Sequence, residues 1–170
     1  MAFDAEAASA PQVVEAPTTN NSEKASAELA SAAVAEASYT EGSELETHDI
    51  GAAVQAYQRA ILADPKRLDA RINLGRLLHE SGRLSEAVDT YLAALRVCGA
   101  DALLLYNLAV LLDEVERKPE AVRAYEAALK LDPQLADGHY NLALLYEELG
   151  QPKQAIRHMS QYRRLLKGRD

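Results

Sequence analysis

Apolar residues recur along this chain in a pattern that repeats about every 34 residues from roughly position 40 onward. Within one repeat they fall three and four positions apart, which places them on one side of a helix. Leu74 and Leu78 mark a first helix in this way, and Ala87 and Tyr91 mark a second. Alanine and leucine dominate the apolar content, and both favour helices. The pattern therefore predicts an all-α protein of antiparallel helix pairs, and a period of this length is typical of a solenoid.

Equivalent positions of the repeat carry the same residue type several times. They are Asn73, Asn107 and Asn141; Ala53, Ala87, Ala121 and Ala155; and Tyr57, Tyr91 and Tyr125. Gly82 and Gly150 stand where the first helix of a pair should end, in a left-handed turn that favours glycine. Glu116 takes that place in the middle pair, where a left-handed conformation would cost about 1 kcal/mol. Pro119 and Pro152 then open the following helix, whose first N–H needs no partner.

These residues, in this order, resemble the tetratricopeptide repeat family over about residues 38–166. The match rests on Asn73-Leu74-Gly75, Gly82, Ala87, Tyr91 and Ala94 in the first full unit, on Asn107-Leu108-Ala109, Ala121, Tyr125, Ala128 and Pro133 in the second, and on Asn141-Leu142-Ala143, Tyr146, Gly150 and Ala155 in the third. The resemblance implies a right-handed superhelical solenoid of about three and a half units.

The period also sets the expected boundaries of the units. We expect a degenerate first unit over residues 36–67 and full units over residues 68–101, 102–135 and 136–169. Residues 1–35 are expected to form an acidic, alanine-rich flexible tail. From Ser22 onward the spacing of alanine and glutamate permits a helix, which few large side chains would anchor.

The net charge of −8 belongs to the N-terminal segment. Residues 1–50 carry ten acidic side chains and one basic one, whereas residues 51–170 carry sixteen and seventeen. A chain of this sign repels phosphates, which disfavours nucleic-acid binding. Cys98 is the sole cysteine, so no intrachain disulfide can form and a reducing compartment is expected. The sequence shows no signal peptide and no apolar run long enough to span a bilayer, so we expect a cytoplasmic protein without membrane contact.

Side chains that could do chemistry show no catalytic or metal-binding pattern. His48, His79, His139 and His158 include no pair at metal-ligand spacing, and Cys98 has no partner. The sequence contains no nucleophile motif and no glycine-rich phosphate loop. We therefore expect a protein that is not an enzyme and holds no cofactor and no metal.

The candidate binding site is a ladder of asparagines. In tetratricopeptide repeat proteins the first helices line the concave face, so the resemblance implies that Asn73, Asn107 and Asn141 project into a groove. An amide offers both donors and an acceptor, which suits the main chain of an extended peptide. The alternative is that these amides bond to neighbouring helices and specify packing. Helix interiors disfavour asparagine, so its recurrence has a cause under either interpretation.

Residues beside the asparagines extend the candidate peptide site. Ile72, Tyr106 and Tyr140 precede them, and Arg76, Val110 and Leu144 follow three positions later. They predict a mostly apolar surface with a few polar groups, although one or both tyrosines could instead belong to the core. Asp69 and Asp137 stand where some family members carry a lysine that grips a carboxylate. The groove is therefore expected to favour a neutral or basic peptide.

The last helix is a second candidate interface. Arg157, Arg163, Arg164, Lys167 and Arg169 make it basic, and Met159, Tyr162 and Leu166 form an apolar stripe on it. A further repeat would cover that stripe, so we expect self-association or a partner contact through Met159, Tyr162, Leu166 and Arg163. The alternative is that the basic residues are a polar cap that ends the array. A less favoured hypothesis is nucleic-acid binding through this helix, with an affinity that falls steeply with salt.

Together these features predict a non-catalytic protein–protein interaction scaffold or adaptor that binds an extended segment of a partner in its concave groove. A regulatory or assembly subunit of an enzyme complex would have the same sequence features. The acidic N-terminal segment could also fold back onto the basic last helix or occupy the groove, because the charges are complementary.

Overall fold

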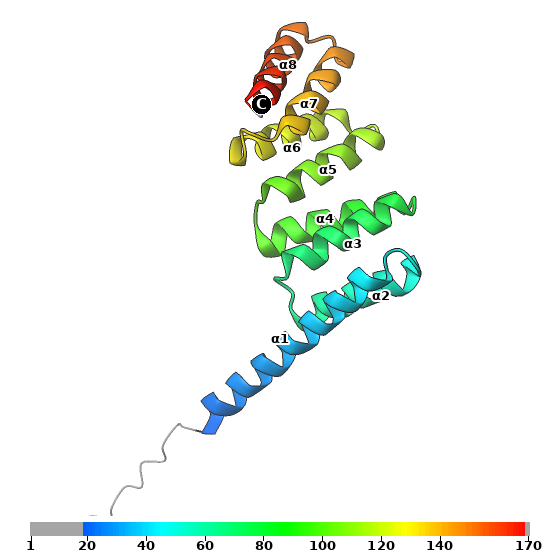
Figure 1. Cartoon of the computed structure of the whole chain (residues 1–170), viewed down its shortest axis with the longest axis vertical. Coiled ribbons are helices and arrows are strands. Elements are labelled where there is room, and N and C mark those ends of the chain that lie inside the picture. Colours follow the sequence, from blue (N-terminus) through cyan, green and yellow to red (C-terminus); the bar gives the residue numbers. More distant parts are fainter. Residues whose placement is uncertain (1–18, 169–170) are drawn as a thin grey trace, which may run out of the picture.

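The computed structural model describes residues 19–168, and within that range the chain forms eight α-helices and no strand. The helices are α1 (Thr19–Leu45), α2 (Ile50–Ala63), α3 (Leu68–Glu80), α4 (Leu84–Cys98), α5 (Ala102–Glu114), α6 (Lys118–Leu131), α7 (Ala136–Glu148) and α8 (Pro152–Lys167). They follow one another in chain order along the molecule (Figure 1). The predicted all-α architecture is confirmed.

Successive helices pair as hairpins, α1 with α2, α3 with α4, α5 with α6 and α7 with α8, and the most extensive contacts lie within these pairs. Each hairpin packs on the next through α2 against α3, α4 against α5 and α6 against α7. First helices of neighbouring hairpins also touch directly, α3 against α5 and α5 against α7, so they lie on the inner side of the stack. Hairpins stacked in this way form the solenoid that the sequence period predicted.

The turns inside three of the hairpins share one conformation. Gly82, Glu116 and Gly150 have positive φ angles of 73°, 61° and 68°. In the first of these turns, the N–H of Arg83 donates to the Leu78 carbonyl oxygen at 2.8 Å, which satisfies a carbonyl at the end of the helix. The prediction that Glu116 adopts a left-handed conformation in place of glycine is confirmed.

Large rings facing very small residues characterise the core. Tyr57, Tyr91 and Tyr125 are at most 1% exposed. A Cβ atom placed on Gly75 would lie 2.3 Å from the ring of Tyr91, and one placed on Gly42 would lie 3.0 Å from the ring of Tyr57. Small residues on the first helix therefore let the second helix bring a whole tyrosine ring against its backbone.

Helix α1 begins at Thr19, close to Ser22, the residue from which the sequence permits a helix. It runs without interruption to Leu45, so residues 19–35, which we assigned to a flexible tail, are helical. The stretch contains no proline and is rich in alanine, the strongest helix former. Its second half is anchored on α2, whose end is marked by a hydrogen bond from Ser31 Oγ to the Ala63 carbonyl oxygen (2.6 Å). The remainder of the expected tail, residues 1–18, lies outside the described residues.

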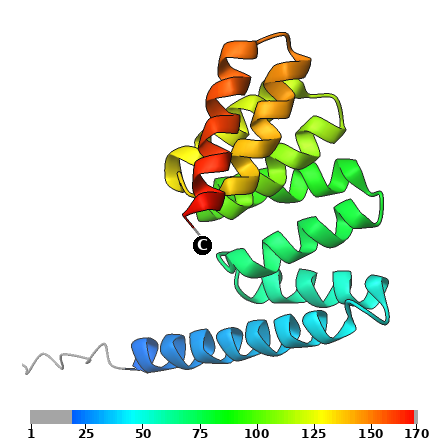
Figure 2. The same cartoon turned by 45° about the horizontal axis from the view of Figure 1, so that its top comes forward.

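The first part of α1, before Ser31, projects beyond the end of α2. Residues 20–30 are all exposed, and Leu29 among them is 73% exposed. Figure 2 shows this part of α1 running on past the rest of the stack. A helix of this length is marginal in water by itself, so the projection depends on its continuity with the packed half of α1.

Candidate peptide-binding groove

The three asparagines of the ladder lie on the inner helices α3, α5 and α7, where they are half-buried. Asn73 Nδ2 donates hydrogen bonds to the hydroxyls of Tyr39 and Tyr57, both at 3.3 Å. Asn141 Nδ2 donates to the hydroxyl of Tyr106 at 3.1 Å. These tyrosines belong to the preceding hairpin, so the amide nitrogens tie neighbouring hairpins together. This is the packing role that we set beside the peptide-binding role.

Asn107 lies near the hydroxyl of Tyr91 on α4. Burial raises the pKa of Tyr91 to about 12 and raises the pKa of Tyr106 above its ordinary value. Both hydroxyls therefore keep their protons at neutral pH. A neutral hydroxyl that accepts from an amide still has its own proton to donate, so the ladder presents oriented polar groups as well as holding the stack together.

The residues that flank the asparagines differ in how much surface they offer. Ile72 is only 8% exposed and belongs to the core cluster, so it offers little surface to a partner. Val110 and Tyr106 are half-buried, and the ring of Tyr106 packs edge-on against Tyr125 with centroids 6.0 Å apart. Tyr140 and Leu144, both on α7, are each 40% exposed and offer the largest apolar surface of the predicted set.

Arg76, the basic residue predicted in the groove, is engaged by two carboxylates. Its guanidinium bonds to Glu46 at 2.6 Å and to Glu80 at 3.1 Å. The positive charge is therefore balanced within the chain. This pairing leaves Arg76 poorly suited to grip the carboxylate of a partner, in agreement with the expected preference for neutral or basic peptides.

A hollow of about 390 Å³ lies between the first turns of α3 and α5. It is lined by Leu68, Asp69, Ile72, Asn73, Asp101 and Leu103. Leu103 is 53% exposed there, and the carboxylate of Asp101 caps α5 by accepting from the Leu104 N–H at 3.0 Å. Sequence reasoning missed Leu103 and Asp101. The signal for Leu103 was present, because it is a leucine at the repeat position where Asp69 and Asp137 are acidic.

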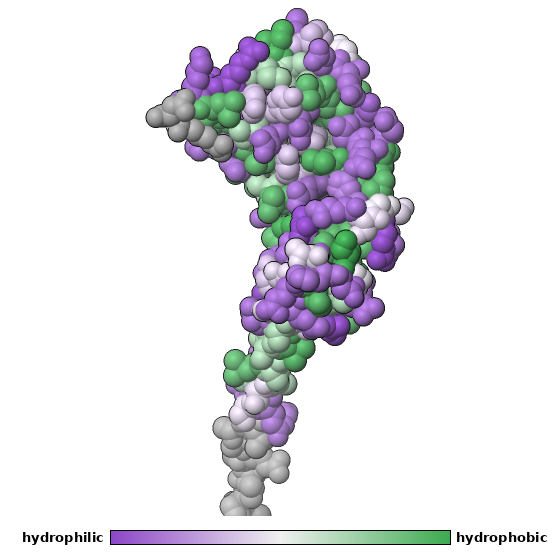
Figure 3. All heavy atoms as spheres, turned by 45° about the vertical axis from the view of Figure 1, so that its right-hand side comes forward, coloured by the Kyte–Doolittle hydropathy of each residue, from purple (hydrophilic) through white to green (hydrophobic). Residues whose placement is uncertain are grey.

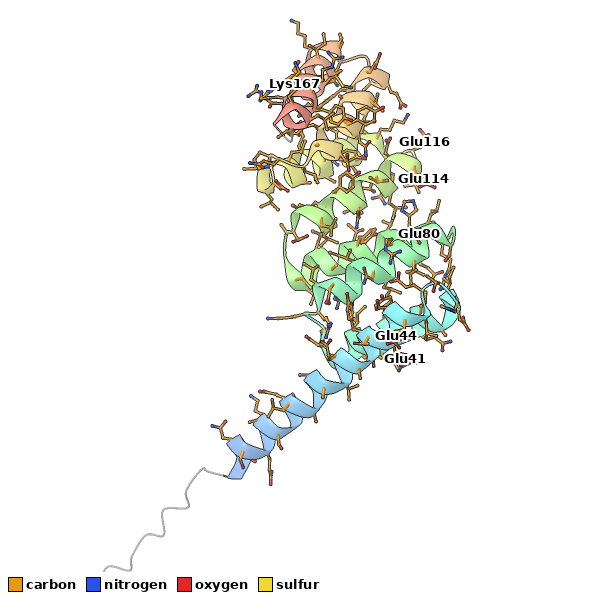
Figure 4. All side chains as sticks on the ribbon, in the orientation of Figure 1. Glu41, Glu44, Glu80, Glu114, Glu116 and Lys167 are labelled. Carbon is orange, nitrogen blue, oxygen red and sulfur yellow. The ribbon has the colours of Figure 1, made fainter. Side chains whose placement is uncertain are left out.

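Ion pairs bridge neighbouring hairpins along the edge of the stack where the first helices end. Arg76 reaches Glu46, His79 contacts Glu114, and Lys118 reaches Glu148 at 2.6 Å. Figure 4 shows acidic side chains of this edge, with Glu80 labelled on one hairpin and Glu114 and Glu116 on the next. These pairs are partly exposed, so water screens them and each contributes little to stability. They orient the hairpins more than they stabilise them.

The predicted C-terminal interface residues lie together on α8. Met159 and Tyr162 are half-buried, Leu166 is 41% exposed, and Arg163 is exposed. The ring of Tyr162 packs against Tyr140 with centroids 5.0 Å apart, so it extends the apolar surface of α7. Beside them is a hollow of about 420 Å³, lined by Ala143, Glu147, Pro152, Ala155, Ile156, Met159 and Arg163.

Ile156 is the part of this C-terminal surface that sequence reasoning missed. It is 67% exposed, which makes it one of the most exposed large apolar residues of the stacked hairpins. Its position three residues before Met159 places it on the same side of the helix and could have revealed it. On the face drawn in Figure 3, hydrophobic residues form separate patches among hydrophilic ones.

The described part of the chain holds no group of three or more His, Cys, Asp or Glu side chains that could bind a metal ion. Among the same residues, no helix is long and apolar enough to cross a membrane.

Stacked helical hairpins with exposed side chains along their inner helices define an α-solenoid of the kind that presents an extended concave surface. Sequence models of one family match three parts of this chain. Two of them, described as tetratricopeptide repeat, match residues 43–102 and 137–165, and a third, described as TPR repeat, matches residues 117–150. The chain is a tetratricopeptide repeat protein, as the sequence motifs indicated, and this family membership supports a protein-interaction scaffold.

Solved structures with a similar fold include several of MamA. A crystal structure of MamA protein has a TM-score of 0.73 and 23% identity, and covers 79% of this chain and 74% of its own. MamA 41-end from Desulfovibrio magneticus RS-1 has a TM-score of 0.71 and 22% identity, and covers 89% and 92%. Identities this low show the shared fold alone. No curated protein sequence matches the chain.

Proposed function

We propose that the protein binds an extended, neutral or basic segment of a partner protein along its inner helices. The observation that carries the proposal is the hollow of about 390 Å³ beside Asn73. An exposed leucine, Leu103, lines it together with the acidic residues Asp69 and Asp101. An apolar anchor surrounded by a few oriented acceptors is the arrangement that binding sites typically use.

The surface continues along the inner helices toward the C-terminal hairpin. Tyr140 and Leu144 are exposed on α7, and Tyr106, whose hydroxyl accepts a hydrogen bond from Asn141, lies on α5, the helix that also lines the hollow. A peptide in extended conformation alternates N–H and C=O groups along its length. Amides and neutral hydroxyls can serve both, which supports main-chain recognition along this path.

Charge supports a neutral or basic peptide. Asp101 lines the hollow and Asp137 is exposed on α7, while Asp69 is already paired with Arg67 and Arg76 with two glutamates. A partner segment that carries lysine or arginine gains favourable potential on approach, whereas an acidic tail is repelled. Regulation of an enzyme by such a scaffold would use the same groove.

The proposal is tested by affinity capture with the full chain and matched variants. Leu103→Asp removes the apolar anchor of the groove, and Leu62→Asp makes the same change on the outer side, where Leu62 is 82% exposed. Asn107→Ala and Tyr106→Ala then probe the ladder. A partner that binds in the groove should be lost with Leu103→Asp and retained with Leu62→Asp.

The binding segment of the captured partner is then identified as a peptide, and the affinity of this peptide for the chain is measured by calorimetry. We expect Leu103→Asp to weaken binding by roughly tenfold or more, because the anchor of an interface carries much of its energy. A partner whose affinity is unchanged by Leu103→Asp and by Tyr106→Ala, yet lost with Leu62→Asp, would place the binding site on the outer face and rule out the groove.

A further inference from the structure

The two ends of the stack expose faces that would otherwise be covered by another hairpin. Inside the stack, the first helix of each hairpin packs on the second helix of the hairpin before it. We call each of these contacts a joint, and leucines contribute to them. Leu129 of α6 lies against Gly138 of α7, where an added Cβ atom would be 3.0 Å from the leucine. Leu74 of α3 lines a hollow together with Ile61 and Leu62 of α2.

The N-terminal end replaces these leucines with acids. Gly42 and Gly75 each face the core tyrosine of their own hairpin, so these two glycines set the register in which α1 aligns with α3. Glu41 and Glu44 thereby take the positions of Leu74 and Leu77. The two leucines are 6% and 2% exposed, whereas both glutamates are exposed. The same register places Ala37 where α7 has Gly138, so the face keeps a small residue at the point where a side chain from another hairpin would enter.

The C-terminal end makes the opposite replacement. When α8 is aligned with α6 through the repeated alanines Ala155 and Ala121, Arg163 takes the position of Leu129, and Ile156 takes that of Val122. Both are exposed, and both line the hollow of about 420 Å³ between α7 and α8. Lys167 follows Arg163 by one helical turn on the same side. This surface therefore corresponds to the contact that α6 makes with the following hairpin, but it carries Arg163 where α6 carries Leu129.

The charges of the two ends are complementary. Helix α1 contains five acidic residues and one basic residue, and α8 contains five basic residues and no acidic one. Within residues 19–168, none of the basic residues of α8 forms an ion pair, and Glu44 forms none either. Glu41 pairs with Arg59 at 2.7 Å, but both side chains are about half exposed and can exchange partners. Figure 4 shows Glu41 and Glu44 at one end of the stack and Lys167 at the other.

We propose that two copies of this chain join head to tail, with α1 of one copy packed on the α7–α8 end of the next. The joint continues the internal stacking register: Arg163 enters above Ala37, Ile156 packs on the alanine-rich face of α1, and Glu41 and Glu44 pair with Arg163 and Lys167. The contact uses different surfaces on the two copies, so each added copy leaves one end of each kind available. The mass of the assembly therefore grows with concentration, and salt weakens it. This surface is separate from the inner groove.

The test is the mass of the full chain, measured by light scattering and sedimentation over a range of concentrations. Glu41→Lys/Glu44→Lys reverses the charge of the N-terminal end, which we call the head. Arg163→Glu/Lys167→Glu reverses the charge of the C-terminal end, the tail. Each variant alone should weaken self-association by roughly tenfold or more, because like charges then face each other. A mixture of the two variants should regain it, since the head of one matches the tail of the other. Circular dichroism melts confirm that each variant is folded.

Arg96→Glu/Lys130→Glu is the matched control, because it changes the charge by the same amount at exposed residues of inner second helices. It should leave the mass unchanged. A wild-type chain that stays monomeric at high concentration overturns the proposal and identifies the charged ends as polar caps. Self-association that survives Glu41→Lys/Glu44→Lys overturns it as well, because a contact between two copies of α8 does not need the head.

Discussion

The inner second helices and the last second helix have the same pattern but very different surroundings. In α6, five residues are buried: Ala121, Ala124, Tyr125, Ala128 and Leu129. In α8, which repeats the same spacing one period later, no residue is buried to that degree. Helix α6 is covered by its own partner and by the following hairpin, whereas α8 has a helix on one side only. A helix inside a solenoid is buried because neighbours cover it on two sides. A helix at the end of the stack is covered on one side only, so the same sequence pattern leaves it more exposed.

The residues of α8 differ in chemistry from their equivalents in α6. His158 stands at the position of Ala124, Met159 at that of Tyr125, and Arg163 at that of Leu129. Each replacement brings a polar or flexible side chain to a place where the inner helix has a packed one. The last hairpin should therefore contribute less to stability and respond more to pH and to partners than the inner hairpins do.

The largest expected effect contrasts Tyr125→Ala with Met159→Ala. Tyr125 is 1% exposed and its loss leaves a cavity between two hairpins, so we expect a cost of about 3–5 kcal/mol. Met159 is half-buried at the equivalent position, and its truncation should cost about 1–2 kcal/mol. Urea unfolding followed by circular dichroism measures both. Equal costs would show that the last hairpin is as tightly packed as the inner ones.

A second contrast uses the glycines that face core tyrosines. A Cβ atom on Gly75 meets the Tyr91 ring at 2.3 Å, so Gly75→Ala should destabilise the protein by about 1–2 kcal/mol despite the better helix propensity of alanine. Gly42→Ala, with a contact at 3.0 Å in the first hairpin, should stay within about 0.5 kcal/mol of the wild type. Thermal melts of the two variants decide between them. A neutral Gly75→Ala would mean that the inner hairpin can spread as easily as the first one.

Substitutions in the turns should change the stability of the protein by a smaller amount, with opposite signs for an inner hairpin and for the last hairpin. Glu116→Gly removes the strain of a left-handed glutamate in an inner hairpin and should stabilise the protein by about 0.5–1 kcal/mol. Gly150→Glu introduces the same strain in the last hairpin and should cost about 1 kcal/mol. Both changes are read from the midpoint of urea unfolding. A destabilised Glu116→Gly would assign the glutamate a stabilising contact that outweighs its backbone strain.

The hairpins themselves could be predicted from the sequence, because the recurring residues show which positions of successive repeats are equivalent. Gly82, Glu116 and Gly150 fall at one position of the period, so the left-handed turn of Glu116 followed from its glycine equivalents. The start of α1 could not be predicted in this way. Residues 20–30 lie outside the repeat and are exposed, so only local propensity indicated their structure, and local propensity is a weak guide.

The candidate site could be predicted less completely than the fold. The asparagines were recognised, but their tyrosine partners were not, because Tyr39 and Tyr106 lie 34 and 35 residues before the amides that they bind. Ile72 illustrates the same gap, since a period shows that a position recurs without showing which side of the helix the next hairpin covers. Leu103 and Ile156 were missed for the opposite reason. An apolar side chain is normally assigned to the core, and its exposure depends on the shape of the stack.

The smallest expected effect tests the last hairpin through its histidine pair. His139 Nε2 lies 3.0 Å from the Pro133 carbonyl oxygen, so this nitrogen carries the proton and donates it. The Nδ1 atom of neutral His139 is then an acceptor, and it receives a hydrogen bond from His158 Nδ1 at 3.0 Å. When both rings are protonated, both Nδ1 atoms are donors, so this hydrogen bond is lost and the two charged rings repel each other. In the hairpin before, the equivalent residues are Leu105 and Ala124, which do not titrate.

The sign of the pH effect follows from the environment of His158. Burial lowers its pKa below the ordinary value, and the neighbouring His139 and Arg157 lower it further, while Glu126 on α6 acts in the other direction. The unfolded chain therefore takes up the proton first. The contribution to stability is complete above the ordinary histidine pKa of about 6.5 and is lost as the pH falls from there through the lowered pKa.

Hydrogen exchange measures this loss locally, because protection factors corrected for the intrinsic rate report the opening of single helices. Between pH 7.5 and pH 5.5 we expect the protection of α8 to fall more than that of α6. The double variant His139→Leu/His158→Ala, which copies the preceding hairpin, should remove the difference, and His48→Gln at an exposed position should not. If α8 and α6 lose protection equally in the wild type, acid acts on the whole stack, and the last hairpin is no more independent than those inside it.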